Sequence, residues 1–306
     1  MDENGYRFGY EHGNAEYEHI ALASHKNTEV LRISPVTINP VLNLDMFGRQ
    51  SFSNAGIRAA FYSAAFLLQR VIADQLDVDP VEIEIADIVR VETNGGDPTA
   101  EIILTDELPN GSGFVRKLFE DISTIIESSI TLGTDNRYLS SIQSEEHREE
   151  CKDACYDCLK VFRNMNYHGL LDWRLAISLL RSLVDTEYQA GADGGFSDYY
   201  ELESWPKEAR KLRDTFAESF NFEVKEEYNL PVLKARTGMV VIVVHPLWKC
   251  HISDSGLPNL PADTWLSEEV FKVYQDASAD NASVRFIDSF NLQRRPGWCY
   301  QQLLNS

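Results

Sequence analysis

Long apolar runs are missing from this 306-residue sequence. None approaches the roughly 18 residues that a membrane-spanning helix needs. The longest candidate, Met239–Val244, has the length of a buried strand. The N-terminus (MDEN) also lacks the basic region and apolar stretch of a secretory signal. These absences predict a cytoplasmic protein with no membrane partner.

Positive charge is scarce. The chain has 28 Lys and Arg against 48 Asp and Glu, a formal net charge of −20. A protein that grips DNA alone usually presents a basic footprint, so this chain either contacts nucleic acid through a local basic patch or binds a protein partner. A DNA mimic is the weakest interpretation, because no phosphate-like track of acidic residues is present.

Motifs for nucleotide hydrolysis are also missing. No segment fits the phosphate-binding pattern G-x-x-x-x-G-K-[ST], and no acidic Mg²⁺ motif lies nearby. The sequence therefore predicts a non-enzymatic subunit rather than an ATPase.

Hydrophobic periodicity predicts an α+β fold: a mixed sheet packed with central helices, a helical zinc-knuckle module and a C-terminal α/β part. Residues 1–188 and 199–306 are expected to be separate domains, and the Gly/Asp-rich segment Gln189–Asp198 is the linker candidate. The expected helices are 56–76, 114–132, 205–220 and 266–275, with 140–183 mostly helical. The expected strands are 29–33, 81–91, 100–105, 222–234, 238–244 and 284–287, with a turn at 94–97.

Cysteine is rare but clustered. Three of the five cysteines lie within eight residues, at Cys151, Cys155 and Cys158. With His147 they form the pattern H-x3-C-x3-C-x2-C, which favours a metal over disulfides. On one straight helix the four would span about 16 Å, too far for one ion. A zinc site thus requires the helix to break near Lys152–Ala154, after which Cys155-x2-Cys158 forms a knuckle that opens the next helix.

The fourth ligand is the open question. His147 precedes Cys151 by one helical turn on the same face, which favours it over His168, the alternative ligand. Three thiolates make zinc a poor Lewis acid, so we expect a structural ion rather than a catalytic one. The alternative is three buried cysteines without metal.

Other polar residues have less certain roles. Asn164, His168, Asp172 and Arg174 are expected to brace the knuckle. Gly111–Gly113 is interpreted as a plain turn into a helix rather than a phosphate site. Arg294, Arg295 and Trp298 form a basic and aromatic patch, interpreted as a protein interface before a nucleic-acid contact.

One enzymatic alternative remains. Glu223-Val-Lys225 fits the E-x-K piece of a restriction-type, Mg²⁺-dependent nuclease. Such a site needs another carboxylate on a neighbouring strand. The nearest candidates, Asp198 and Asp214, do not lie on convincing strands.

Several stretches together resemble a known family: Leu104–Phe114, Cys155–Leu159 and Asn164–Arg174, with Ala59–Leu68, Leu76–Glu84, His245–Trp248, Phe286–Leu292 and Arg294–Trp298. They are similar to the zinc-binding C-terminal domain of a class of superfamily 2 DNA helicases. That class includes bacterial repair helicases and the helicase-associated B subunit of the DISARM phage-defence system, which is the closer match. The knuckle with Asn-x3-His-x3-Asp-Trp-Arg is the specific part of a resemblance that covers nearly the whole chain.

The resemblance implies structural zinc on Cys151, Cys155 and Cys158. Some members use a fourth cysteine, which is missing near this cluster, and His147 is expected in its place. Members usually carry more chain before this domain, whereas here Met1 lies close to its boundary. The resemblance therefore implies a split helicase for anti-phage defence, in which a superfamily 2 ATPase partner supplies the motor and DNA is reached through the complex. The alternatives are an accessory factor of a DNA-repair helicase and the nuclease subunit.

Overall fold

The N-terminal part combines a three-stranded sheet with long helices. The structure, a computed structural model, describes residues 28–48, 54–108, 113–253 and 257–305. The strands β1, β2 and β3 form an antiparallel sheet in the order β1-β3-β2. Its elements are β1 (Val30–Ile33), α1 (Asn54–Leu76), a 3₁₀ turn (Pro80–Glu82), β2 (Ile83–Glu92), β3 (Pro98–Asp106) and α2 (Phe114–Ile130). The predicted hairpin around residues 94–97 is confirmed.

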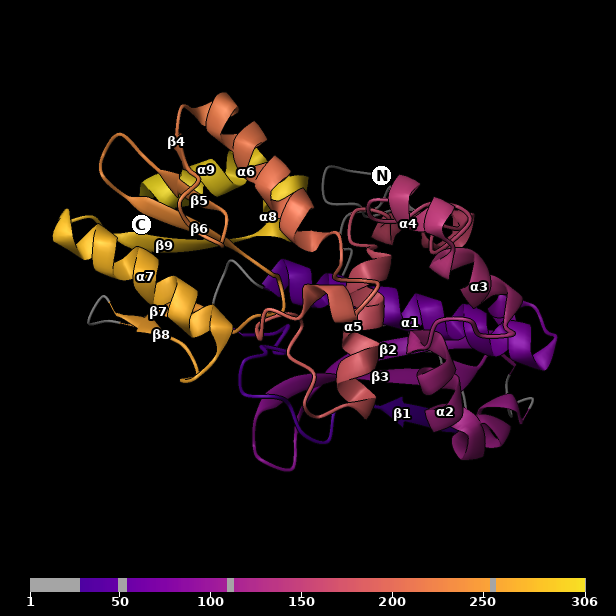
Figure 1. The fold of residues 1–306 in the computed structure, drawn as a ribbon. Coiled ribbons are helices and arrows are strands. Elements are labelled where there is room, and N and C mark those ends of the chain that lie inside the picture. The colour runs from indigo at the N-terminus through magenta and orange to yellow at the C-terminus, as the bar shows by residue number, and fades with distance from the viewer. Residues whose placement is uncertain (1–27, 49–53, 109–112, 254–256, 306) are drawn as a thin grey trace, which may run out of the picture.

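Helix α1 is the centre of the main core. Apolar side chains occur all round it, so it is buried on most sides rather than along one stripe. Residues such as Phe61, Leu68 and Ile72 are almost fully buried, which confirms the central position expected from the sequence. In Figure 1, α1 crosses the right-hand part of the molecule, with α5 (Trp173–Val184) in front and the sheet below. No helix in the described ranges is long and apolar enough to cross a membrane.

The zinc module, defined as residues 137–172, contains little regular structure. Two short helices, α3 (Arg137–Gln143) and α4 (Glu145–Glu150), are followed by turns and a 3₁₀ helix (Phe162–Tyr167). The sequence expectation of a mostly helical segment over 140–183 is therefore wrong between Cys151 and Val161. The backbone there forms turns that bring the cysteine side chains together, in place of continuous helical hydrogen bonds.

The C-terminal part is built on a mixed four-stranded sheet in the order β4-β5-β6-β9, in which only the β6–β9 pair is parallel. All five residues of β6 are buried, because helices cover both faces of the sheet. Figure 1 shows α6, α8 and α9 above the sheet and α7 below it. The elements are α6 (Trp205–Phe220), β4 (Glu223–Lys225), β5 (Val232–Lys234), β6 (Val240–Val244), β7 (His251–Ile252), β8 (Pro258–Asn259), α7 (Trp265–Ala279), β9 (Val284–Asp288), α8 (Ser289–Arg294) and α9 (Pro296–Asn305).

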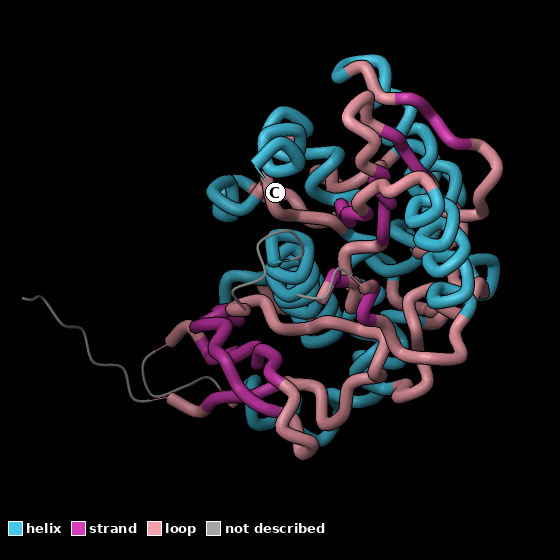
Figure 2. The backbone as a smooth tube through the Cα atoms, turned by 90° about the vertical axis from the view of Figure 1, so that its left-hand side faces the viewer, coloured by secondary structure: helices cyan, strands magenta, loops and turns pink. Residues whose placement is uncertain are grey.

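Because successive residues of a strand point to opposite faces of the sheet, the two faces pack into two different hydrophobic cores. Leu233, Val241 and Ile287 pack with α6 and α9 in a small cluster. Their neighbours Val240 and Ile242 belong to the main core, which continues into the N-terminal part. In Figure 2 the strands gather at lower left and upper right, with helices between them. The fold is α+β, as predicted.

The first part of the expected linker, Gln189–Asp198, is packed, although Asp193, Gly194, Ser197 and Asp198 are exposed. Ala190 and Ala192 are fully buried, and the Ala190 carbonyl accepts from the Trp248 indole at 2.9 Å. The Ala192 carbonyl accepts from the Leu266 amide at 2.9 Å. Glycines at positive φ, Gly191 and Gly194, let this tight segment fit under aromatic rings. The linker expectation is wrong for this segment, and the division into 1–188 and 199–306 stays a prediction.

Candidate metal centre

Helix α4 presents the first two residues of the cluster. Ser144 begins the helix by accepting from the His147 amide at 3.2 Å, and Cys151 ends it in an extended conformation. The Cys151 amide still donates to the His147 carbonyl at 2.8 Å, so the two side chains lie one turn apart on the same face. The helix break required by a zinc site is thus present, at Cys151, immediately before Lys152–Ala154.

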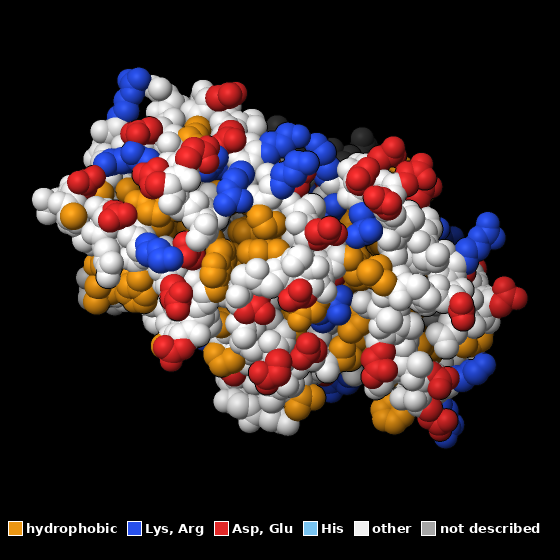
Figure 3. All heavy atoms as spheres, in the orientation of Figure 1, with side chains coloured by type: hydrophobic (Ala, Val, Ile, Leu, Met, Phe, Trp, Pro, Cys, Tyr) orange, Lys and Arg blue, Asp and Glu red, His pale blue; other side chains and the backbone are white. Residues whose placement is uncertain are grey.

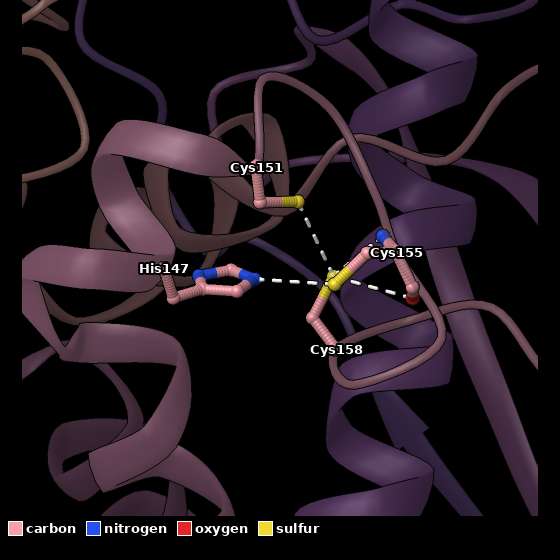
Figure 4. A group of neighbouring side chains, drawn as sticks. All are labelled: His147, Cys151, Cys155 and Cys158. Carbon is pink, nitrogen blue, oxygen red and sulfur yellow. Dashed lines mark hydrogen bonds between the residues drawn. The ribbon is translucent and has the colours of Figure 1, made fainter.

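The knuckle brings the other two cysteines to the same point. Cys155 donates its amide to the Cys158 sulfur at 3.0 Å, which closes a tight turn. The Cys158 sulfur lies 3.6 Å from that of Cys155 and 3.9 Å from that of Cys151. The His147 Nε2 lies 3.6 Å from the Cys155 sulfur (Figure 4). The expectation that the knuckle opens a helix is wrong, because turns separate Cys158 from the 3₁₀ helix.

The geometry of the four residues fits one tetrahedral ion. Their ligand atoms all lie within 4.8 Å of one another, and no other group of three or more His, Cys, Asp or Glu in the described ranges could hold a metal. With Zn–S bonds of about 2.3 Å, tetrahedral sulfurs are separated by roughly 3.8 Å, close to the distances found here. Three sulfurs and one imidazole fill four positions and leave none for water. The arrangement suits a closed structural site.

The charge state of the thiols follows from their contacts. The hydrogen bond from Cys151 lowers the pKa of Cys158 to about 4, whereas the same bond and burial raise the pKa of Cys151. Burial, and then the Cys158 charge, raise the pKa of Cys155. The Cys158 thiolate is therefore hydrogen-bonded by the neighbouring thiols of Cys151 and Cys155, which keep their protons. Since only thiolates ligate zinc, binding of the ion would expel those protons.

His147 is oriented toward the sulfurs by its other nitrogen. Its Nδ1 lies 2.8 Å from the Ile142 carbonyl. A carbonyl can only accept, so Nδ1 carries the proton and Nε2 keeps its lone pair free for a metal. His168, the alternative ligand, lies elsewhere: its Nε2 contacts the Val161 carbonyl at 3.1 Å and the Asn164 side-chain oxygen at 3.0 Å. The structure thus brings His147, and not His168, into the cluster.

A layer of donors satisfies the carbonyls freed by the helix break. Arg174 donates to the carbonyls of Cys151 and Lys152, at 2.9 and 3.0 Å, and to that of Arg148 at 2.6 Å. The Trp173 indole also donates to the Cys151 carbonyl, at 3.0 Å. The Tyr138 hydroxyl donates to the Cys158 carbonyl at 2.7 Å. The bracing role expected for Arg174 is confirmed.

Two other residues expected to brace the knuckle, Asn164 and Asp172, act at different places. Asn164, which is buried, holds the knuckle exit by donating to the Leu159 carbonyl and accepting from the Val161 amide, both at 2.9 Å. Asp172 begins α5 by accepting from the amides of Arg174 and Leu175. Burial raises the pKa of Asp172 to about 6.

The C-terminal part contributes a contact that the sequence did not indicate. Arg294 pairs with Asp153 at 3.0 Å and donates to the Leu171 carbonyl at 2.9 Å. Arg294 thus bridges α8 to the knuckle, and the interface role of the patch stays a prediction. Arg295 does stack over Trp298, with 3.9 Å from its guanidinium to the ring. Arg294 and Asp153 lie too far apart in the sequence for a local pattern to indicate their contact.

The other candidate sites do not assemble. At the start of α2, the buried Asp106 carboxylate already accepts from the amides of Gly113 and Val115, so an internal negative charge occupies the place that a phosphate would take. Gly111 and Ser112 lie outside the described residues. Glu223 pairs with Lys225 at 2.6 Å on the short strand β4. Asp214 pairs with Arg213 on α6 and Asp198 lies in a 3₁₀ turn, so no second strand carboxylate faces Glu223 in the described ranges.

Comparison with known proteins gives the cluster its context. Residues 64–159 match the family model of the MrfA Zn-binding domain, and this range contains all four cluster residues. The matched segment is a zinc-binding domain. Together with the Cys/His cluster, the match identifies zinc as the cofactor of the protein. No curated protein matches the chain.

A solved structure also aligns with part of the chain. It is the crystal structure of the DUF1998 helicase MrfA bound to DNA, with 15% sequence identity and a TM-score of 0.28. The aligned part covers 45% of this chain and 15% of the MrfA chain. A TM-score this low carries no weight for the fold. The zinc-binding assignment therefore depends on the family match and the cluster.

Proposed function

We propose that this protein is a non-catalytic accessory subunit of a superfamily 2 DNA helicase complex, stabilised by structural zinc on His147, Cys151, Cys155 and Cys158. The observation that carries the proposal is the four-residue cluster inside a segment matched by the MrfA Zn-binding domain. The subunit would act in the cytoplasm in DISARM-like anti-phage defence, scaffolding a separate ATPase motor and reaching DNA through the complex.

The local structure supports a structural role for the ion. Between Cys151 and His168, Ala154 and Leu159 are the only buried apolar side chains other than those of cysteines. The turns there are held by side chains that bond to backbone carbonyls. A metal bound to four residues would supply much of the folding free energy that such a segment lacks. A correctly folded module could then serve as a rigid docking unit for the motor.

Metal analysis of four proteins tests the ligand set. The wild type should contain equimolar zinc, whereas Cys155→Ser and His147→Ala should lose most of it. The matched control is His168→Ala, which removes an imidazole from the same module and should keep the metal, because His168 contacts Val161 and Asn164 instead. Zinc retained by His147→Ala but lost from His168→Ala would reverse the assignment.

The non-catalytic role has its own test. These 306 residues contain no phosphate-binding loop, so the purified chain should hydrolyse neither ATP nor DNA. It should copurify with an ATPase and raise the unwinding rate of that motor. Robust ATP hydrolysis by the isolated chain, lost on substitution of its own residues, would contradict the proposal.

A genetic experiment tests the biological setting. Deletion of the gene, or replacement by the Cys155→Ser form, should increase phage plaquing in a host that carries the rest of the system. Growth under DNA-damaging conditions should be unchanged. The opposite pattern, sensitivity to damage with normal phage resistance, would instead indicate an accessory factor of a repair helicase.

A further inference from the structure

A large cleft opens where the two parallel strands of the C-terminal sheet end. It has a volume of about 780 Å³ and lies between α4 and α6. Its lining includes His245 and Pro246, which follow β6, and Ser289, which follows β9. β6 and β9 form the parallel pair. Ligands of open α/β sheets commonly bind beyond the carboxyl ends of parallel strands, and the volume is typical of a small-molecule site.

His245 brings an unused hydrogen-bond donor to this cleft. The side chain is only 3% exposed, and its Nδ1 accepts from the Leu247 amide at 3.3 Å. Burial lowers the pKa of His245 to about 3, so the imidazole is neutral at physiological pH. Its proton is therefore on Nε2, which has no hydrogen-bond partner in the part of the chain that the structure describes. A buried N–H is costly unless something accepts from it.

Helix α6 begins beside His245. Its first residue, Trp205, contacts the His245 ring at 5.8 Å between centroids and donates its indole N–H to the Ser289 hydroxyl at 3.0 Å. The hydroxyl still has its own proton to donate. The Ser204 side chain does not cap the helix, and the Lys207 amide has no hydrogen-bond partner among the described residues. A helix start of this kind carries partial positive charge and favours an anion.

Two acidic side chains near the start of α6 are already paired. Glu201 bonds to Arg181 at 2.7 Å, and Glu203 bonds to Arg148 at 3.3 Å. All but Arg181 belong to the lining of the cleft. The negative charges of these two carboxylates are therefore compensated within the protein and oppose an anionic ligand less than free carboxylates would.

Positive charge remains on the α6 side of the cleft. Lys207 and Lys211, one turn apart, are exposed and form no ion pair with another described residue, and Glu208 is the acidic residue that α6 adds to the lining. Two further acids, Glu145 and Glu149, lie on α4, on the other side. Figure 3 shows a group of basic side chains beside α6 and a group of acidic ones over α4. An anion is thus favoured at the start of α6.

We propose that this cleft binds a small organic anion. Its carboxylate or phosphate group would accept from the His245 Nε2–H and the Ser289 hydroxyl, where the Lys207 amide and ammonium group add positive charge. Its apolar body would lie against Leu212 and Phe290, which line the same cleft. The inference goes beyond the accessory function and does not depend on it.

Competition for a fluorescent anion tests the proposal on the zinc-loaded full chain. The reporter is anilinonaphthalene sulfonate, and the competitors share one aromatic body: naphthyl phosphate, naphthoate and uncharged naphthol. The better of the two anions should displace the reporter at a concentration roughly 10-fold or more below that of naphthol, and it identifies the charged group as phosphate or carboxylate. Equal displacement by all three would overturn the proposal, as would no binding of the reporter.

A lysine variant locates the anion. Lys207→Ala removes an exposed charge and should weaken binding of the preferred anion roughly 2- to 5-fold. The matched control is Lys117→Ala, at an exposed lysine near the start of α2 and outside the cleft, which should bind like the wild type. Equal effects of the two substitutions would place the anion elsewhere and overturn the proposal.

Variants of His245 test the buried donor. His245→Leu removes the N–H and should weaken anion binding roughly 10-fold or more, whereas His245→Gln, whose amide can donate, should retain most of it. Naphthol should compete equally well in all three proteins, and equal weakening for naphthol and the anions would overturn the donor role. Melting temperature and zinc content monitor folding. If His245→Leu does not fold, His245→Gln and Lys207→Ala with its control carry the test.

Discussion

The zinc module and the C-terminal sheet are stabilised in different ways. In the sheet, every residue of β6 is buried between helices, and stability comes from apolar contact on both faces. In the zinc module, the backbone carbonyls around the four clustered ligand side chains accept from Tyr138 and from Trp173 and Arg174 of α5. The first kind of region tolerates loss of a ligand ion, whereas the second should depend on it.

Removal of the metal should separate the two regions most strongly. Apparent binding free energies of structural zinc reach on the order of 10 kcal/mol, so a chelator should unfold the module locally. Hydrogen exchange should accelerate over Cys151–Tyr167 while the amides of β6 stay protected. Uniform loss of protection across both regions would show instead that the sheet also depends on the metal.

A cavity in the C-terminal sheet should destabilise the sheet and leave the zinc module intact, the reverse of metal removal. Ile242 is fully buried, and Ile242→Ala should lower the free energy of unfolding by about 2–5 kcal/mol. Chemical denaturation measures this loss, and zinc content should be unchanged. Val161→Ala, at a side chain that is 37% exposed, is the control with a smaller expected effect. Zinc loss in Ile242→Ala would link the two regions more closely than their contacts suggest.

The buried acid at the end of β9 should give the sheet region a pH dependence. Burial raises the pKa of Asp288 from 3.8 to about 6, so the folded state binds its proton more tightly than the unfolded state. Its contribution to stability is therefore present below about pH 4 and is lost as the pH rises to about 6. The loss is about 3 kcal/mol for a shift of this size.

Asp288→Asn removes this titration. The difference in unfolding free energy between variant and wild type should move in favour of the variant between pH 4 and pH 6.5. Any pH-independent effect of the substitution on the α8 cap is the same at both pH values, so it cancels in the change of that difference with pH. Parallel stability curves for the two proteins would show that Asp288 has an ordinary pKa.

The smallest of these effects should come from the brace of the zinc module. Arg174→Ala leaves the carbonyls of Arg148, Cys151 and Lys152 without this donor, at a cost of roughly 1–3 kcal/mol. The rate of zinc release to a chelator should increase. Arg174→Lys should restore little, because an ammonium group cannot span three carbonyls as the guanidinium does. Full rescue by lysine would indicate that charge alone matters.

Local sequence signals predicted most regular elements. The helix Trp205–Phe220 matches its expected bounds, with Pro206 in its first turn and apolar residues at helical spacing. The hairpin of β2 and β3 followed from its turn residues. Helices α8 and α9 were missed, because they are short and adjoin Arg294-Arg295-Pro296, where no clear period is visible. The linker at 189–198 was misjudged because its small residues contact aromatic rings: Phe196 in the same segment, and Trp248 and Trp265 from distant ones.

For the candidate site too, local sequence signals predicted one part and tertiary packing determined the rest. Sequence spacing alone indicated three cysteines and a histidine one turn away, and it required the helix to end near Cys151, because one ion cannot reach residues spread along a straight helix. Only the tertiary structure decided which histidine joins the cysteines, since that depends on which imidazole lies near the sulfurs: the His147 Nε2 lies 3.6 Å from the Cys155 sulfur, whereas the His168 Nε2 contacts the Val161 carbonyl. It also brought Arg294 to Asp153, a contact between segments whose pairing is determined by packing of the whole chain.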